Sequence, residues 1–284
     1  MPDPRRTLVL ICDVQERFRT VERPAALPLA DHAVAGSAIH GFDAVTATIA
    51  KMVKAAQVSS SFVSPEPSLV YEMTSCWRCP SSPQNRTQAV GYPLLAFSLL
   101  VLITDSPAAL GTTVPELGLA SLPPSLNLGV FSKTQVSPPF PASGPLLTLH
   151  ASQFSMVVPS VQRALDEVET RGTRFDNYIV VGIEAHVCVL QTTLGLLGAS
   201  TMRNVFVLAD GISSCNRQEV PIAIQRMRQA GAKITTSESI LFQMMGDASS
   251  PHFKPFAALI KAEKEKTKDA LGTLLDDLDP WTQV

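Results

Sequence analysis

Charge is scarce in this chain of 284 residues. Charged side chains make up 17% of the residues, against roughly 25% in a typical soluble domain. Lysine and arginine together number 23 and aspartate and glutamate 25, so the formal net charge is −2. A protein that binds nucleic acid needs an excess of positive side chains to neutralise phosphates. The composition therefore argues against a nucleic-acid partner.

Cysteine is also sparse, with five residues. An odd number scattered over a long chain does not form the disulfide framework of small secreted domains. The first residues, MPDPRRTLVLICDV, lack the long apolar stretch of a secretory signal. We therefore expect a cytoplasmic protein in a reducing compartment. The length suffices for one large α/β domain with a substantial core.

A long run of uncharged residues requires a separate explanation. Residues 87–104, TQAVGYPLLAFSLLVLIT, carry no charge over 18 positions, near the lower limit of about 17–25 residues for a membrane span. Gly91 and Pro93 interrupt the run, and it has no Lys or Arg flank on its far side. We expect a buried strand at residues 100–104 and no membrane partner.

Strand and helix patterns alternate along the rest of the chain. Apolar runs rich in β-branched residues predict buried strands, and apolar spacings of three and four predict helices. This alternation favours an α/β fold with a mainly parallel sheet and helices on both faces. The expected strands are 7–14, 100–104, 178–183, 205–209 and 233–236; the expected helices are 42–57, 158–170, 186–197, 220–230, 237–245 and 254–264. The charged run after residue 262 is expected to be a solvated helix or a frayed end.

Three segments interrupt this alternation, at residues 21–36, 58–99 and 136–153. They are rich in Ala, Pro or Ser, and the last carries no charge and four prolines. Structureless connections of this length are uncommon inside a compact domain. We expect either long surface loops or inserted sequence.

Two residues near the carboxyl ends of predicted strands could carry chemistry. Asp13 ends the first strand, and ligands bind beyond the carboxyl ends of strands in open parallel sheets. Cys188 falls in the first turn of the helix after strand 178–183, where the helix dipole favours a thiolate. An aspartate that ends a strand is more often a turn residue, and a free cysteine is more often structural. Lys133 has the simpler interpretation of a solvated loop lysine, but near Asp13 and Cys188 it would lower the pKa of both groups.

Several motifs in order resemble the isochorismatase-like cysteine hydrolases, and in particular the isochorismatase domain-containing proteins of eukaryotes. They are LICDVQERF, ALGTTVPELG, FSKT, FSMV, VGIEAHVCVLQTTLGLL and VFVLADGISSCNRQ, and the similarity extends over about 200 residues. The resemblance implies a Rossmann-like three-layer sandwich with a six-stranded, mainly parallel sheet, and a homo-oligomer that acts on a small-molecule substrate.

The resemblance also implies a catalytic triad of Asp13, Lys133 and Cys188. Asp13 would take the thiol proton, Cys188 would attack a carbonyl carbon, and Lys133 would stabilise the charged pair. The backbone N–H groups of the turn after the strand would form an oxyanion hole. These oxyanion donors would come from Ala185, His186, Val187 and Cys188.

Other polar residues near this turn have weaker assignments. Gln15, Phe18 and Glu184 could line a substrate pocket, although packing and capping are the simpler roles. The His186 side chain could assist a proton transfer, but satisfaction by solvent is the simpler expectation. Cys12 is expected in the core and Cys215 in a loop. We expect no metal and no cofactor, because the D-x-H of a nicotinamidase metal site is missing and Cys76 and Cys79 form a single C-x-x-C pair.

The three irregular segments fall where the family's motifs follow one another almost directly. Two of them begin with Val-Ser after Gln, at Val58 and Val136, and the common splice-donor sequence GTAAGT encodes Val-Ser. We hypothesise that at least two are translated introns; genuine loops are the alternative. Without them about 208 residues remain, the size of one domain. We expect a single domain with core segments 7–20, 37–57, 100–135 and 154–262 and a charged tail at 263–284.

The sequence therefore predicts a hydrolase that cleaves a C–N bond of a small amide through a cysteine nucleophile. One alternative is a vinyl-ether hydrolase of the isochorismate type that uses Asp13 alone as an acid. Another is a binding or regulatory protein with the same fold and an impaired site.

Overall fold

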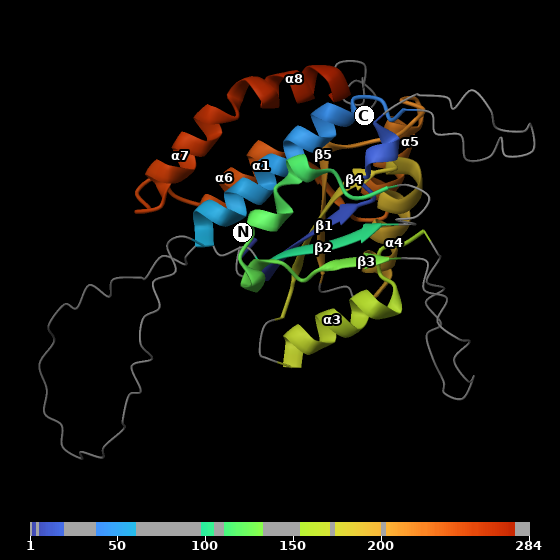
Figure 1. The fold of residues 1–284 in the computed structure, drawn as a ribbon, viewed down its shortest axis with the longest axis horizontal. Helices are drawn as coiled ribbons and strands as arrows, with labels where there is room; N and C mark the ends of the chain where they lie inside the picture. The colour runs from blue at the N-terminus through green and yellow to red at the C-terminus, as the bar shows by residue number, and fades with distance from the viewer. Residues whose placement is uncertain are drawn as a thin grey trace, which may run out of the picture.

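The computed structural model describes residues 2–3, 6–19, 38–60, 98–104, 111–132, 154–170, 174–199 and 203–275. Within these ranges the chain forms one six-stranded sheet in the order β3-β2-β1-β4-β5-β6 (Figure 1). Every pair of neighbouring strands is parallel. The strands are β1 Thr7–Cys12, β2 Ser98–Thr104, β3 Val130–Ser132, β4 Asn177–Ile183, β5 Asn204–Ser213 and β6 Lys233–Thr235.

Helices cover both faces of the sheet. The α-helices are α1 Phe42–Ser60, α3 Pro159–Thr170, α4 Leu190–Ala199, α5 Glu219–Gln229, α6 Ser237–Met245, α7 Phe253–Ala262 and α8 Lys264–Leu275. Short helical turns are η2 Glu16–Phe18, η4 Pro115–Leu117, η5 Leu119–Ser121, η6 Pro124–Leu126 and the π-helical η7 Ala185–Val189. The predicted α/β fold with a parallel sheet and helices on both faces is confirmed.

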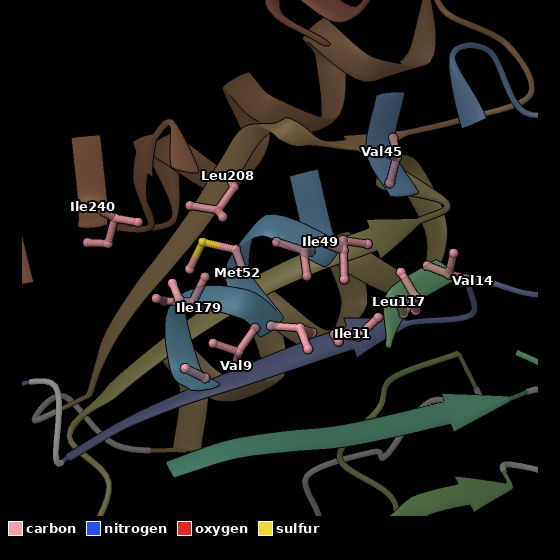
Figure 2. Close-up of a cluster of buried hydrophobic side chains, with 14 of the residues drawn as sticks. Val9, Ile11, Val14, Val45, Ile49, Met52, Leu117, Ile179, Leu208 and Ile240 are labelled. Carbon is pink, nitrogen blue, oxygen red and sulfur yellow. The ribbon is translucent and has the colours of Figure 1, made fainter. Parts of the chain in front are cut away.

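The alternation of side chains along the strands divides the core into two clusters. Val9 and Ile11 of β1 face α1 and pack with Ile49 and Met52 (Figure 2). The same cluster continues to α6, α7 and α8. Leu8 and the other alternate residues of the strands face α3, α4 and α5. Because every residue of β1 and β4 is buried, their sequences read as continuous apolar runs.

The order of the strands places β1 and β4 at the centre of the sheet. The chain runs from β1 to β2 and β3 in one direction and returns to add β4, β5 and β6 on the other side. This reversal is the switch point at which open parallel sheets bind ligands, beyond the carboxyl ends of the strands.

The C-terminal part of the described chain differs from expectation. Residues 264–275 are not a solvated tail: α8 packs along α1, with Thr267, Ala270 and Leu274 buried. Lys51 Nζ donates a hydrogen bond to Thr267 Oγ1 at 2.8 Å, and Lys54 Nζ lies 2.7 Å from Glu263 Oε1. The three buried residues of α8 are surrounded by charged residues, so the sequence did not indicate that this helix packs against the core.

Several boundaries also differ from those predicted. Helix α1 continues through Ser60, three residues beyond the predicted end, and β5 continues to Ser213. The expected helix at 186–197 begins as the π-helical η7, and the one at 254–264 ends in α7 before α8 starts. The segments expected to be irregular lie outside the described residues, except that 58–60 belong to α1 and 98–99 to β2. None of the described helices combines the length and the apolar character needed to cross a bilayer.

Candidate active site

Asp13 follows the last residue of β1 and is buried, with 1% of its surface exposed. Its backbone has a φ of +46°, and within the described ranges it is the one non-glycine residue with a positive φ. The Gln15 N–H donates to the Asp13 carbonyl oxygen at 3.0 Å, which closes a tight turn. This left-handed backbone conformation is unfavourable for a residue other than glycine, so the surrounding structure must hold it in place.

The segment 111–114 supplies that support. The Glu16 N–H donates to Thr112 O at 3.0 Å and the Val114 N–H donates to Val14 O at 3.1 Å. The Gln15 side chain adds a third bond, from Nε2 to Gly111 O at 2.6 Å. The turn after β1 is thus tied to a segment about 100 positions further along the chain.

Cys188 follows the neighbouring strand β4. Its side chain is buried in the turn η7, and the turn is preceded by a cis peptide bond between Ile183 and Glu184. The Glu184 carbonyl oxygen accepts hydrogen bonds from the N–H groups of Val187 and Val189, both at 3.1 Å. Of the four expected oxyanion donors, Val187 therefore already donates its N–H to the protein.

A glycine brings the ends of the two strands together. Gly182 pairs with Cys12 in the register of β1 and β4, and its φ is +110°. A Cβ atom at this position would lie 2.2 Å from the carbonyl oxygen of Cys12 and 2.9 Å from its carbonyl carbon. The close backbone approach requires glycine. Asp13 and the turn of Cys188 thus follow directly from two strands that are in backbone contact.

The Glu184 side chain lies against the loop after β5. Its Oε2 accepts hydrogen bonds from the backbone N–H of Cys215 at 3.3 Å and from the Cys215 thiol at 3.0 Å. His186 Nδ1 is 3.7 Å from the same oxygen and 2.9 Å from Ser214 Oγ. The Nδ1 atom of His186 therefore bonds to the protein and not to solvent, contrary to expectation.

The other sequence candidates are placed as follows. Lys133 lies outside the described residues; Ser132, immediately before it, is the last residue of β3. Phe18 packs against the α1 side of the core. Cys12 is buried in the opposite cluster, where its thiol donates to Met156 Sδ at 2.9 Å, so its predicted place in the core is confirmed.

Within the described part of the chain, no three His, Cys, Asp or Glu side chains gather in a geometry that could hold a metal ion. The residues Cys76 and Cys79 lie outside that part. Two features that fix the site were not recognised in the sequence, the contacts of Ser214 and the backbone contact at Gly182. The isolated glycine inside the apolar run YIVVGI was a usable signal for the second of these.

Comparisons with known proteins agree with the fold and the motifs. A family model for the isochorismatase domain matches residues 147–239. The secreted isochorismatase effector Isc1 of Phytophthora sojae is 36% identical over 174 residues, which cover 61% of this chain and 71% of that protein. The isochorismatase domain-containing protein 2 of Bos taurus is 35% identical over 180 residues, or 63% of this chain and 72% of that protein.

Solved structures share the same architecture. The MAR1 ribonuclease of Caenorhabditis elegans is 26% identical, with a TM-score of 0.58 over 91% of both chains. The YcaC protein of Escherichia coli, an octameric hydrolase of unknown specificity, is 16% identical, with a TM-score of 0.54 over 95% of this chain and 93% of that one. The second likeness concerns the fold alone. On the strength of its curated relatives, the chain belongs to the isochorismatase-like hydrolase family.

Proposed function

We propose that this chain is a cysteine hydrolase that cleaves the C–N bond of a small amide, with Cys188 as the nucleophile and Asp13 as the proton acceptor. The observation that carries the proposal is the backbone contact between Gly182 and Cys12. A buried carboxylate lies one residue after β1 and a buried thiol lies five residues after the adjacent strand β4, at the switch point of the sheet. An acid–base group and a nucleophile in one dry site are the minimum that acyl transfer needs.

The proposed reaction has two halves. Asp13 takes the proton of the Cys188 thiol, and the thiolate attacks the carbonyl carbon, whose oxygen receives the electron pair of the C=O bond. The tetrahedral intermediate collapses, the C–N bond breaks, and the amine leaves with the proton from Asp13. Water then adds to the thioester, Asp13 takes its proton, and the acid is released as the C–S bond breaks and the thiol is restored. The proposed role of Lys133 is to stabilise the charged Asp13 and Cys188 pair.

The turn η7 supports the proposed oxyanion hole only in part. Peptide N–H groups at the start of a helix have no acceptor within the helix, and such groups stabilise a developing oxyanion. The Val187 N–H is bonded to Glu184 O. We therefore leave the Val187 amide out of the proposed oxyanion donors.

Gln15 favours an amide over a vinyl ether as substrate. This side chain is fully buried two residues after Asp13, and within the described ranges its Oε1 atom has no hydrogen-bond partner. A buried carbonyl oxygen without a donor is costly, by about 1–3 kcal/mol. If substrate binding uncovers this fully buried atom, an amide N–H of the substrate would satisfy it, whereas a vinyl ether has no donor at the bond that breaks.

The test is turnover of matched primary, secondary and tertiary amides by the wild type, Cys188→Ala and Asp13→Asn. We expect Cys188→Ala to lose at least about 10³-fold in kcat, the order seen when a catalytic nucleophile is removed. The tertiary amide, which lacks an N–H, should be the poorest substrate. Unchanged turnover by Cys188→Ala would eliminate the thiol mechanism. If Asp13→Asn loses activity while Cys188→Ala keeps it, and the wild type hydrolyses a vinyl ether, then Asp13 acts alone as an acid.

We further propose that the chain is a single domain that forms a homo-oligomer. Both hydrophobic clusters draw on the same strands β1, β4 and β5, which supports one folded unit. Sedimentation velocity tests the assembly, and a monomer at micromolar concentration would refute it.

A further inference from the structure

Glu184 contacts the Cys188 turn through its backbone and a second part of the fold through its side chain. Its carbonyl oxygen accepts the N–H groups of Val187 and Val189, the residues on either side of Cys188. Its carboxylate reaches away from the turn to the loop after β5, where Cys215 donates two hydrogen bonds to Oε2. The same residue thus joins the turn to a second element of the fold.

The loop that receives this carboxylate is itself fixed. Ser214 is fully buried, and its carbonyl oxygen accepts the His40 N–H at 3.1 Å. The Ser213 hydroxyl donates to His40 O at 2.6 Å, and His40 Nε2 lies 3.0 Å from Thr273 O. The loop is therefore bonded to the chain just before α1 and, through His40, to α8.

The charge at this junction is mostly shielded from water. The side chains of Glu184 and His186 expose 24% and 26% of their surfaces, and His186 Nδ1 lies 2.9 Å from Ser214 Oγ and 3.7 Å from Glu184 Oε2. Hydrogen bonds to an ionised acceptor are stronger than those between neutral groups, and low exposure increases this difference. A partly buried carboxylate with two donors from one residue holds its own backbone in one orientation.

We propose that Glu184 is a positioning residue for Cys188, and this inference rests on the function proposed above. The carboxylate, anchored by the backbone N–H and the thiol of Cys215, fixes the direction of the Glu184 carbonyl. That carbonyl fixes the amides of Val187 and Val189, and with them the thiol between them. We prefer this role for Glu184 to the predicted one in the substrate pocket, because both donors to its Oε2 belong to Cys215 in the loop after β5.

The variants that test the proposal separate the side chain from its partners. Glu184→Ala removes the carboxylate, and Glu184→Gln keeps one acceptor oxygen of nearly the same shape. Cys215→Ala removes the thiol donor, and Cys215→Ser keeps a hydroxyl donor. Glu265→Gln, an exposed carboxylate on α8, is the matched control.

Two readouts are needed, steady-state kinetics with a primary amide and hydrogen exchange of a peptide that covers residues 184–190. For Glu184→Ala we expect kcat to fall at least about tenfold with KM within about twofold, because a small displacement of a reacting group lowers the rate more than binding. The amides of the turn should exchange about tenfold faster, while those of β4 are unchanged. Glu184→Gln and Cys215→Ser should recover most of both values, and Glu265→Gln should match the wild type.

A rise in KM with unchanged kcat would overturn the proposal and make Glu184 a substrate contact. Unchanged exchange in Glu184→Ala and Cys215→Ala would also overturn it. If Glu184→Ala does not fold, Glu184→Gln and Cys215→Ala still give both readouts. The exchange experiment does not depend on turnover. Retained activity in Cys188→Ala would refute the proposed role of Cys188 as the nucleophile. Hydrogen exchange would still decide whether Glu184 holds the turn.

Discussion

Replacing Gly182 with alanine perturbs the contact on which the proposed site depends. The new methyl group would meet the Cys12 backbone at 2.2 Å from O, 2.7 Å from N and 2.9 Å from C. Ordinary contacts between heavy atoms are near 3.5 Å, so β1 and β4 would have to separate by roughly 1 Å. None of the three close atoms belongs to a side chain that could turn aside.

The expected loss of stability has two parts. The φ of +110° is unfavourable for alanine and costs about 1–3 kcal/mol, and the overpacked contact costs about 1–3 kcal/mol more. Gly231→Ala is the matched control, because Gly231 has a φ of +104° and a methyl group added to it would meet no atom within 4 Å. Alanine also lowers the entropy of the unfolded chain, but this effect is the same in both variants and cancels when their unfolding free energies are compared.

Urea unfolding of the three proteins measures the difference. With a slope of about 1–3 kcal/mol per molar urea, an extra 2 kcal/mol moves the midpoint by about 1 M. We expect Gly182→Ala to unfold at clearly lower urea than Gly231→Ala and to lose at least about tenfold in kcat, since displacement of aligned groups by about 1 Å is costly. Equal midpoints for the two variants would refute the claim that backbone contact sets the spacing of Asp13 and Cys188.

Two further predictions concern the buried lysine and the irregular segments. Burial lowers the pKa of Lys51 below its usual 10.5, against attraction from Asp210, Glu238 and Glu263. The unfolded lysine therefore binds more protons than the folded one just below pH 10.5, and wild-type stability rises with pH in that window. We expect Lys51→Met to be at least as stable as the wild type at pH 7 and to lose its advantage towards pH 10 in urea titrations; an advantage that grows with pH would contradict this. For the translated-intron hypothesis, the intact mass of the protein from its own cells should be about a quarter below 30.5 kDa, and a mass of 30.5 kDa would show that the segments are genuine.

The central strands could be predicted because burial on both faces leaves a continuous apolar signal. β1 and β4 were recognised from TLVLIC and YIVVGI, and the ends of those strands led to Asp13 and Cys188. The extension of β5 to Ser213 was missed because Asp210 follows the apolar run. In the fold this carboxylate is fully buried and accepts hydrogen bonds from the N–H and hydroxyl of Ser237, a partner 27 residues away.

The contacts around Glu184 could not be predicted for a similar reason. They depend on where the extended end of β5 leaves the sheet, which no local pattern specifies. The motif placed Glu184 and His186 beside Cys188 but gave no direction for their side chains. A helix after residue 262 was one of the two expectations, but its packing against α1 was not predicted, because one alanine, one threonine and one leucine make too narrow an apolar stripe to stand out among lysines and acids.

The position of β1 between β2 and β4 has a consequence for synthesis of the chain. Thr7 pairs with Asn177, so one edge of the central strand finds its partner only after about 170 further residues have been made. At about 5–20 residues per second, this takes on the order of ten to thirty seconds. During that time the apolar TLVLIC segment has one unpaired edge on the ribosome. Nascent chains of this protein should therefore be strong clients of chaperones that bind extended apolar segments, until β4 emerges and closes the sheet.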